Sequence, residues 1–172
     1  MTGKETGPVT DIEILKAVII EVMKALPPAP FLCLPLSACL YAKLRDHHKV
    51  DAELVTGNLV FRGDLLFKQD FSIEGAKANQ LRDWGGHAWV EVGGLICDLS
   101  FFRTLYSDEF DRPYKAKLIE AYGHGRGAIV GSPETLRRED GLQYQRIDSL
   151  SDPMATAIIK GIEHLPIWKG AK

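Results

Sequence analysis

Three side chains in this sequence have the chemistry and the order of a nucleophilic site. Cys33 lies at the predicted start of a helix, His87 begins a predicted strand, and Asp98 ends the strand that follows. A thiol can attack a carbonyl carbon when an imidazole takes its proton, and a carboxylate can hold that imidazole in the required tautomer. We therefore predict that Cys33, His87 and Asp98 form a catalytic triad.

The segment that contains the histidine and the aspartate predicts a β-hairpin. Residues 86–92 form one strand, Gly93-Gly94 is typical of a two-residue turn, and residues 95–100 return. Paired residues share a face of the sheet, as do residues two apart on one strand. The side chains that then share one face are His87, Trp89, Glu91, Asp98 and Ser100. Asp98 becomes a diagonal neighbour of His87, whereas a three-residue turn would move it to the opposite face.

The three cysteines are predicted to differ in role. Cys39 and Cys97 are interpreted as core residues, which is the usual role of a free cysteine. Cys33 differs because the unpaired amides and positive dipole of a helix N-terminus stabilise a thiolate, as would a charged histidine nearby. The odd number of cysteines, without paired spacing, favours a reducing compartment, so we expect a cytoplasmic location. The spacing also fits no zinc site, and no metal is expected.

Two tryptophans flank the histidine, and both are candidate substrate-binding residues. Packing is the commoner role of tryptophan; the functional alternative for Trp84 and Trp89 is to contact the substrate or shield the His–Asp pair from water. Trp84 belongs to a predicted loop of residues 62–85, which also holds Asn79 and Gln80. All three side chains are candidates for an oxyanion donor or a lid. We expect this loop to border the substrate site, and a mobile surface excursion is the alternative.

The composition is that of a single globular domain. The chain has 172 residues, 45% of them apolar and 26% charged, with a net charge of −2, so neither nucleic acid nor a membrane is expected as a partner. Helical spacing of apolar residues predicts a helix over residues 10–26 and a second helix from Cys33. The further predicted elements are strands at 50–61, 65–67, 128–130 and 142–147 and helices at 113–122 and 152–165. The expected fold is α+β, with N-terminal helices packed on an antiparallel sheet of about four to six strands.

This arrangement resembles the transglutaminase-like superfamily of papain-type cysteine enzymes. In that family a cysteine opens a helix, a strand of the form His-Ala-Trp-x-Glu-Val follows, and an aspartate lies on the next strand. Cys33, residues 87–92 and Asp98 take these places here. The resemblance covers residues 31–101 and implies a papain-like core within one transglutaminase-like domain, preceded by the helix over 10–26 and followed by a C-terminal extension over 102–172.

Within that superfamily, residues 33–40 and 55–57 look most like the branch that contains the leader peptidases of lasso-peptide maturation. The helix of that branch begins cys-leu-x-arg-ser, and Leu36 stands here in place of the arginine. The resemblance implies a cysteine peptidase or amidase that acts on a peptide or small amide without a cofactor. Hydrolysis is favoured over cross-linking because the chain is short and lacks the calcium-ligand runs of large transglutaminases.

One departure from the papain-type pattern favours a second hypothesis. Papain-type sites usually have a side-chain oxyanion donor before the cysteine, but residues 25–32 contain no glutamine, asparagine or tryptophan. The alternative function is therefore a catalytically weak or inactive binding module that keeps the transglutaminase-like fold, since fold does not determine function.

Overall fold

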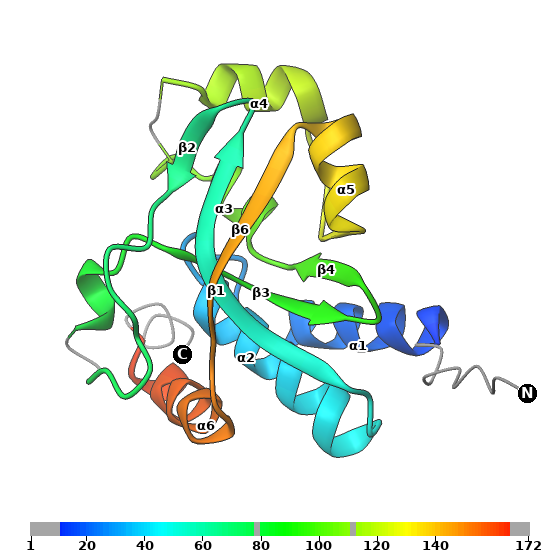
Figure 1. Ribbon diagram of the computed structural model, residues 1–172, viewed down its shortest axis with the longest axis vertical. Helices are drawn as coiled ribbons and strands as arrows, with labels where there is room; N and C mark the ends of the chain where they lie inside the picture. Colours follow the sequence, from blue (N-terminus) through cyan, green and yellow to red (C-terminus); the bar gives the residue numbers. More distant parts are fainter. Residues whose placement is uncertain (1–10, 78–79, 111–112, 166–172) are drawn as a thin grey trace, which may run out of the picture.

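The computed structural model describes residues 11–77, 80–110 and 113–165. Within these ranges the chain forms one antiparallel sheet with helices on both faces, which confirms the expected α+β class (Figure 1). The strands are β1 (Ala52–Phe61), β2 (Asp64–Phe67), β3 (His87–Val92), β4 (Leu95–Asp98), β5 (Ile129–Gly131) and β6 (Leu142–Ser149). The helices are α1 (Ile12–Ala25), α2 (Cys33–Ala42), α3 (Phe101–Leu105), α4 (Lys115–Tyr122), α5 (Pro133–Thr135) and α6 (Asp152–Gly161). Wider helical turns extend α2 and α5, over Lys43–His47 and Leu136–Asp140.

Strand β1 is the centre of the sheet, whose order is β2-β1-β3-β4-β5 with β6 also paired to β1. The two ends of β1 pair with β3 and β2, while β6 runs along its residues 55–61. The register against β6 shifts between Thr56 and Gly57. A Cβ atom at Gly57 would lie 1.9 Å from the carbonyl oxygen of Gln145, so this close approach of two backbones requires glycine.

The β3–β4 hairpin has the predicted two-residue turn. Val92 pairs with Leu95 and Val90 pairs with Cys97, and both turn glycines have positive φ, 57° at Gly93 and 77° at Gly94. Positive φ at both central residues is the requirement of a type I′ turn, which explains the glycine pair. The predicted division of side chains between the two faces is therefore confirmed.

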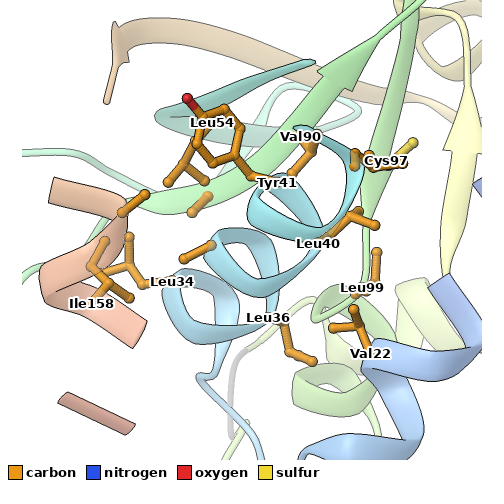
Figure 2. Packing of buried hydrophobic residues seen from close by; sticks show 14 of the residues in the cluster. Val22, Leu34, Leu36, Leu40, Tyr41, Leu54, Val90, Cys97, Leu99 and Ile158 are labelled. Atoms are coloured by element: carbon orange, nitrogen blue, oxygen red, sulfur yellow. The ribbon is translucent and has the colours of Figure 1, made fainter. Parts of the chain in front are cut away.

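One face of the sheet is covered by α1, α2 and α6 (Figure 1). Asp11 caps α1, its side chain accepting from the Glu13 amide at 2.9 Å; the expected start at residue 10 lies outside the described part of the chain. Helix α2 is apolar over most of its circumference and lies at the middle of this layer. Figure 2 shows residues of α1, α2, α6 and the sheet that meet there, among them Val22, Leu36, Leu40, Leu54, Val90, Cys97, Leu99 and Ile158.

The opposite face carries a second apolar cluster rich in aromatic rings. It is formed by the sheet, α3, α4 and the turn after α5, and its fully buried members include Val55, Leu59, Trp89, Phe101, Phe110 and Leu118. Both faces of β3 and β4 are therefore covered, which explains the near-continuous burial of these strands. None of the helices within the described ranges has the length and apolar character needed to cross a membrane.

The C-terminal part of the chain departs most from the predicted elements. Helices α3 and α5 were not expected, because each spans only a few residues and has no apolar periodicity of its own. Strand β6 continues two residues beyond the predicted end at 147. Helix α6 ends at Gly161, and a tighter turn over Ile162–His164 replaces its predicted last residues.

Candidate active site

The structure places the predicted histidine and aspartate in direct contact. The Nε2 atom of His87 lies 2.6 Å from Oδ2 of Asp98, and the two side chains are 2% and 0% exposed. His87 is the first residue of β3 and Asp98 the last residue of β4, so the hairpin turn fixes their separation. The carboxylate therefore holds one ring nitrogen and directs the other, Nδ1, away from itself.

Cys33 completes the predicted group of three. It is the first residue of α2, and a side-chain hydrogen bond and a charge interaction with its sulfur both raise the pKa of His87. Because Asp98 occupies Nε2, Nδ1 is the ring nitrogen that remains to interact with the Cys33 thiol. Cys33 is partly exposed, unlike His87 and Asp98 behind it, so among the three it is the side chain that reaches solvent.

Asp98 is held by five hydrogen bonds. Its Oδ1 atom accepts from the Ser100 amide at 2.9 Å, the Ser100 hydroxyl at 3.1 Å and the Phe101 amide at 3.1 Å. Its Oδ2 atom accepts from His87 and from the Tyr144 hydroxyl at 2.8 Å. The same carboxylate thus caps the first turn of α3 and orients the histidine, and a buried charge with this many donors is well compensated.

The protonation of the pair follows from this contact. Burial alone would lower the pKa of His87, but the Asp98 carboxylate outweighs it and, with Cys33, raises that pKa well above its ordinary value. Burial would raise the pKa of Asp98, yet His87, the Ser100 amide and the Tyr144 hydroxyl lower it. The arrangement therefore favours an imidazolium beside a carboxylate.

Aromatic rings enclose the histidine. The Phe67 ring of β2 stacks on His87 with centroids 4.8 Å apart and an interplanar angle of 21°. Trp89 lies 6.4 Å from the imidazole on the same face of β3, and its indole donates to Glu91 at 3.1 Å. Trp89 is 0% exposed, so it shields the His–Asp pair and does not line an open surface for substrate.

The other two thiols lie in different surroundings. Cys97 is completely buried, and burial together with the nearby Asp98 charge raises its pKa to about 12. Cys39 is partly exposed at the edge of the apolar cluster of α2, and burial raises its pKa as well. Both environments disfavour a thiolate.

The loop before His87 is anchored to the rest of the molecule. Ile73 is 0% exposed, and the Glu74 carboxylate accepts from the amide and hydroxyl of Ser151 ahead of α6. Lys68 N donates to the Gly85 carbonyl at 3.0 Å and closes the base of the loop. These contacts argue against the alternative of a mobile surface excursion and keep the loop next to the histidine.

The three oxyanion donors suggested by the sequence have different outcomes. Trp84 is half-buried against the cluster of α2, and its indole nitrogen is buried without a hydrogen-bond partner in the described part of the chain. Gln80 is exposed, and its side-chain oxygen accepts from the Lys77 amide at 2.9 Å. Asn79 lies outside the described residues. Trp84 is thus the loop side chain with a free buried donor.

Tyr144 is a site residue that the sequence did not reveal. It lies on β6, where it pairs with Leu59 of β1, and its hydroxyl reaches Asp98. Residues 142–147 were predicted as a strand, but no local pattern indicated that this strand pairs with β1. The partner of Asp98 therefore depends on long-range pairing.

Two surface hollows lie away from the triad. One of about 210 Å³ adjoins the β3–β4 turn and is lined by residues that include Glu53, Glu91 and Pro133. The other, of about 440 Å³, lies between the β1–β2 turn and the turn after α5. In the residues that can be described, no group of three or more His, Cys, Asp and Glu side chains is placed to hold a metal ion.

The comparisons with known proteins identified no similar protein. A scan against protein-family models, a search of the curated proteins and a search of the solved structures each found no match.

Proposed function

We propose that this protein is a cysteine-dependent hydrolase or acyl transferase that cleaves an amide or peptide bond, built on a transglutaminase-like, papain-like core. The observation that carries the proposal is the buried 2.6 Å contact between His87 and Asp98, with Cys33 at the start of α2 acting on the same ring. A carboxylate, an imidazole and a partly exposed thiol in this order are the parts of a nucleophilic site. The sequence resemblance supports the same reaction class.

The reaction proceeds through a thioester. The Cys33 sulfur attacks the carbonyl carbon of the amide, and the C–N bond breaks as His87 passes a proton to the leaving amine. Water, or a second amine, then attacks the thioester carbon while His87 takes its proton. The C–S bond breaks, and the Cys33 thiolate is restored beside the imidazolium. Asp98 keeps Nε2 occupied throughout, so the proton moves at Nδ1.

The oxyanion of the tetrahedral intermediate needs donors near Cys33. The first amides of a helix have no partner within the helix, and in the described ranges no side chain caps the N-terminus of α2. Pro35 has no amide hydrogen, so the Cys33 amide is a candidate donor to the oxyanion at this end. The partnerless indole N–H of Trp84 is the candidate for a second donor. It would replace the side chain that papain-type sites carry before the cysteine.

A binding module without turnover is the second candidate. It is favoured by the absence of a side-chain donor in residues 25–32 and by the near-complete burial of His87, which leaves little room around the imidazole. Such a protein would still present Cys33 beside the charged ring. The two candidates therefore differ in whether a thioester forms and is resolved.

Labelling with a peptidyl acyloxymethyl ketone distinguishes them, because this electrophile requires an activated thiol and an amide-like fit. We expect one equivalent on the wild type, none on Cys33→Ala, and undiminished labelling of Cys39→Ala, read by intact-protein mass spectrometry. His87→Ala should label far more slowly. A screen of a peptide library with the wild type and Cys33→Ala then tests for turnover. Equal iodoacetamide labelling of all three cysteines in the native protein would contradict the proposal.

A further inference from the structure

Phe31, two residues before the nucleophile, combines an unusual backbone with an exposed aromatic ring. Its φ is +58°, and its side chain is 48% exposed. For a bulky residue this left-handed conformation is unfavourable and calls for an explanation. The residues on either side are constrained, since Pro30 precedes it and Leu32 is buried at 6% exposure.

The other two non-glycine residues with positive φ in the described chain have ordinary structural reasons. Lys49, at +55°, follows the end of the helical segment that α2 begins, where the left-handed conformation is common. Arg62, at +47°, shares the tight β1–β2 turn with Gly63. Phe31 lies with Pro30 in a turn of the connector between α1 and α2. Positive φ after a proline is an ordinary turn conformation, but glycine or asparagine normally takes that position, so the turn explains the backbone and not the choice of phenylalanine.

Helix α3 holds this connector in place. The Phe31 amide donates to Oγ1 of Thr104 at 3.0 Å, and Thr104 is only 3% exposed. One residue earlier, the Arg103 guanidinium donates to the carbonyls of Met23, Leu26 and Pro27 at the end of α1. The Phe31 amide is thus held by the buried Thr104 hydroxyl and the start of the connector by Arg103, whereas the Phe31 ring is about half exposed.

We propose that Phe31 is a specificity-determining residue that binds a large apolar side chain of the substrate next to the bond under attack; this rests on the proposed function. Its Cα lies within about 7 Å of that of Cys33, because two peptide units separate them. A single exposed hydrophobic residue is ordinary. A residue in an unfavourable backbone conformation, held by a buried hydroxyl beside the proposed nucleophile, is the kind of outlier that accompanies function.

Two peptidyl acyloxymethyl ketones that differ in one side chain, benzyl or methyl, next to the reactive carbonyl provide the test. The wild type should react with the benzyl probe at least about tenfold faster, the discrimination that a hydrophobic contact supplies. Phe31→Ala and Phe31→Gly should bring the ratio of rates close to one. Their rate with iodoacetamide at Cys33 should stay within about twofold of the wild type, which separates recognition from thiol activation.

The matched control is Lys49→Gly, which relieves the same backbone conformation at a site without a role in recognition and should keep the wild-type ratio. Thr104→Val should lower the ratio because Phe31 loses its acceptor, and Thr104→Ser, which keeps the hydroxyl, should retain it. The melting temperature of Phe31→Gly should remain within a few degrees of the wild type. A ratio that Phe31→Ala leaves unchanged overturns the proposal, whereas failure of the wild type to label at Cys33 overturns the proposed function itself.

Discussion

The side chains on the two faces of the β3–β4 hairpin are stabilised by different kinds of interaction. Cys97 and Asp98 are neighbours in sequence and both 0% exposed, yet they point to opposite sides of the sheet. Cys97 packs with Val90 in the apolar cluster beneath α2 (Figure 2), where contacts are non-directional. Asp98 accepts five hydrogen bonds on the other side. Because successive side chains of a strand point to opposite faces, β4 places a packing residue, Cys97, on one side of the sheet and a candidate site residue, Asp98, on the other.

The same carboxylate has opposite consequences on the two faces. Its charge raises the pKa of His87 and keeps the imidazole protonated, and it also contributes to the pKa of about 12 at Cys97, which keeps that thiol neutral. Asp98 therefore favours the charged form of His87 and at the same time the neutral form of the cysteine one residue away. The comparison predicts that changes on the Asp98 face alter activity, and that changes on the Cys97 face alter stability.

The largest expected effect is on turnover in Asp98→Asn. The amide would favour the wrong tautomer of His87 and remove the negative charge that keeps the ring protonated, so kcat should fall by about 10⁴. The rate of Cys33 alkylation at neutral pH should fall in parallel. Asp51→Asn, an exposed substitution of the same kind, is the control and should retain activity. A rate near that of the wild type would mean that another residue orients His87, with Glu91 on the same face as the first candidate.

Tyr144→Phe should have a smaller effect on the same face. It removes one donor from Oδ2 of Asp98 and leaves the ring that contacts Trp89 at 5.1 Å. A hydrogen bond to a charged group contributes about 1.5–3 kcal/mol, so a loss of roughly tenfold in kcat is expected, with a lower melting temperature. Tyr106→Phe removes a hydroxyl bonded to the Gly123 carbonyl at 2.8 Å, away from the triad. Tyr106→Phe should lower the melting temperature and leave kcat unchanged. Equal losses of kcat in Tyr106→Phe and Tyr144→Phe would contradict a specific role for Tyr144.

On the opposite face, Cys97→Ala should cost stability without loss of chemistry. Truncating this fully buried side chain should lower the free energy of unfolding by about 1–2 kcal/mol, as for other small core truncations, and kcat should stay within about twofold. Denaturant unfolding and a rate assay on the same preparation test both parts. A large drop in activity at unchanged stability would show that the two faces are not independent.

The pH dependence of stability gives the finest test. Because the pKa of His87 is raised in the folded wild type, this histidine keeps its proton above about pH 6.5, where the unfolded chain releases it. The stability that the His87 proton contributes is therefore complete below that pH and declines above it. In Asp98→Asn burial should instead lower the pKa of His87, and the corresponding contribution should grow as the pH rises toward neutrality. The difference in free energy of unfolding between the two proteins should therefore shrink from pH 6.5 to pH 9. A difference that widens would contradict the charged state of the pair.

The sequence predicted the features that depend on local alternation. The pattern of residues 87–92, with the glycine pair at 93 and 94, determined the hairpin register and the shared face of His87 and Asp98. The contact of Tyr144 with Asp98 was not predicted because it depends on β6 pairing with β1. The sequence of a strand does not indicate which other strand it pairs with. Thr104 was missed for a related reason: α3 forms where Asp98 caps its first turn, and the contact of Thr104 with Phe31 joins residues 73 positions apart in the sequence.

The position of β6 late in the chain also has a consequence for biosynthesis. A nascent chain that has emerged only as far as β5 already contains Cys33, His87 and Asp98, but it leaves the edge of β1 unpaired and Asp98 without its tyrosine. Unpaired strand edges promote association with other chains. Because β6 covers that edge and also supplies the hydroxyl, the thiol acquires its full surroundings only after β6 has been synthesised.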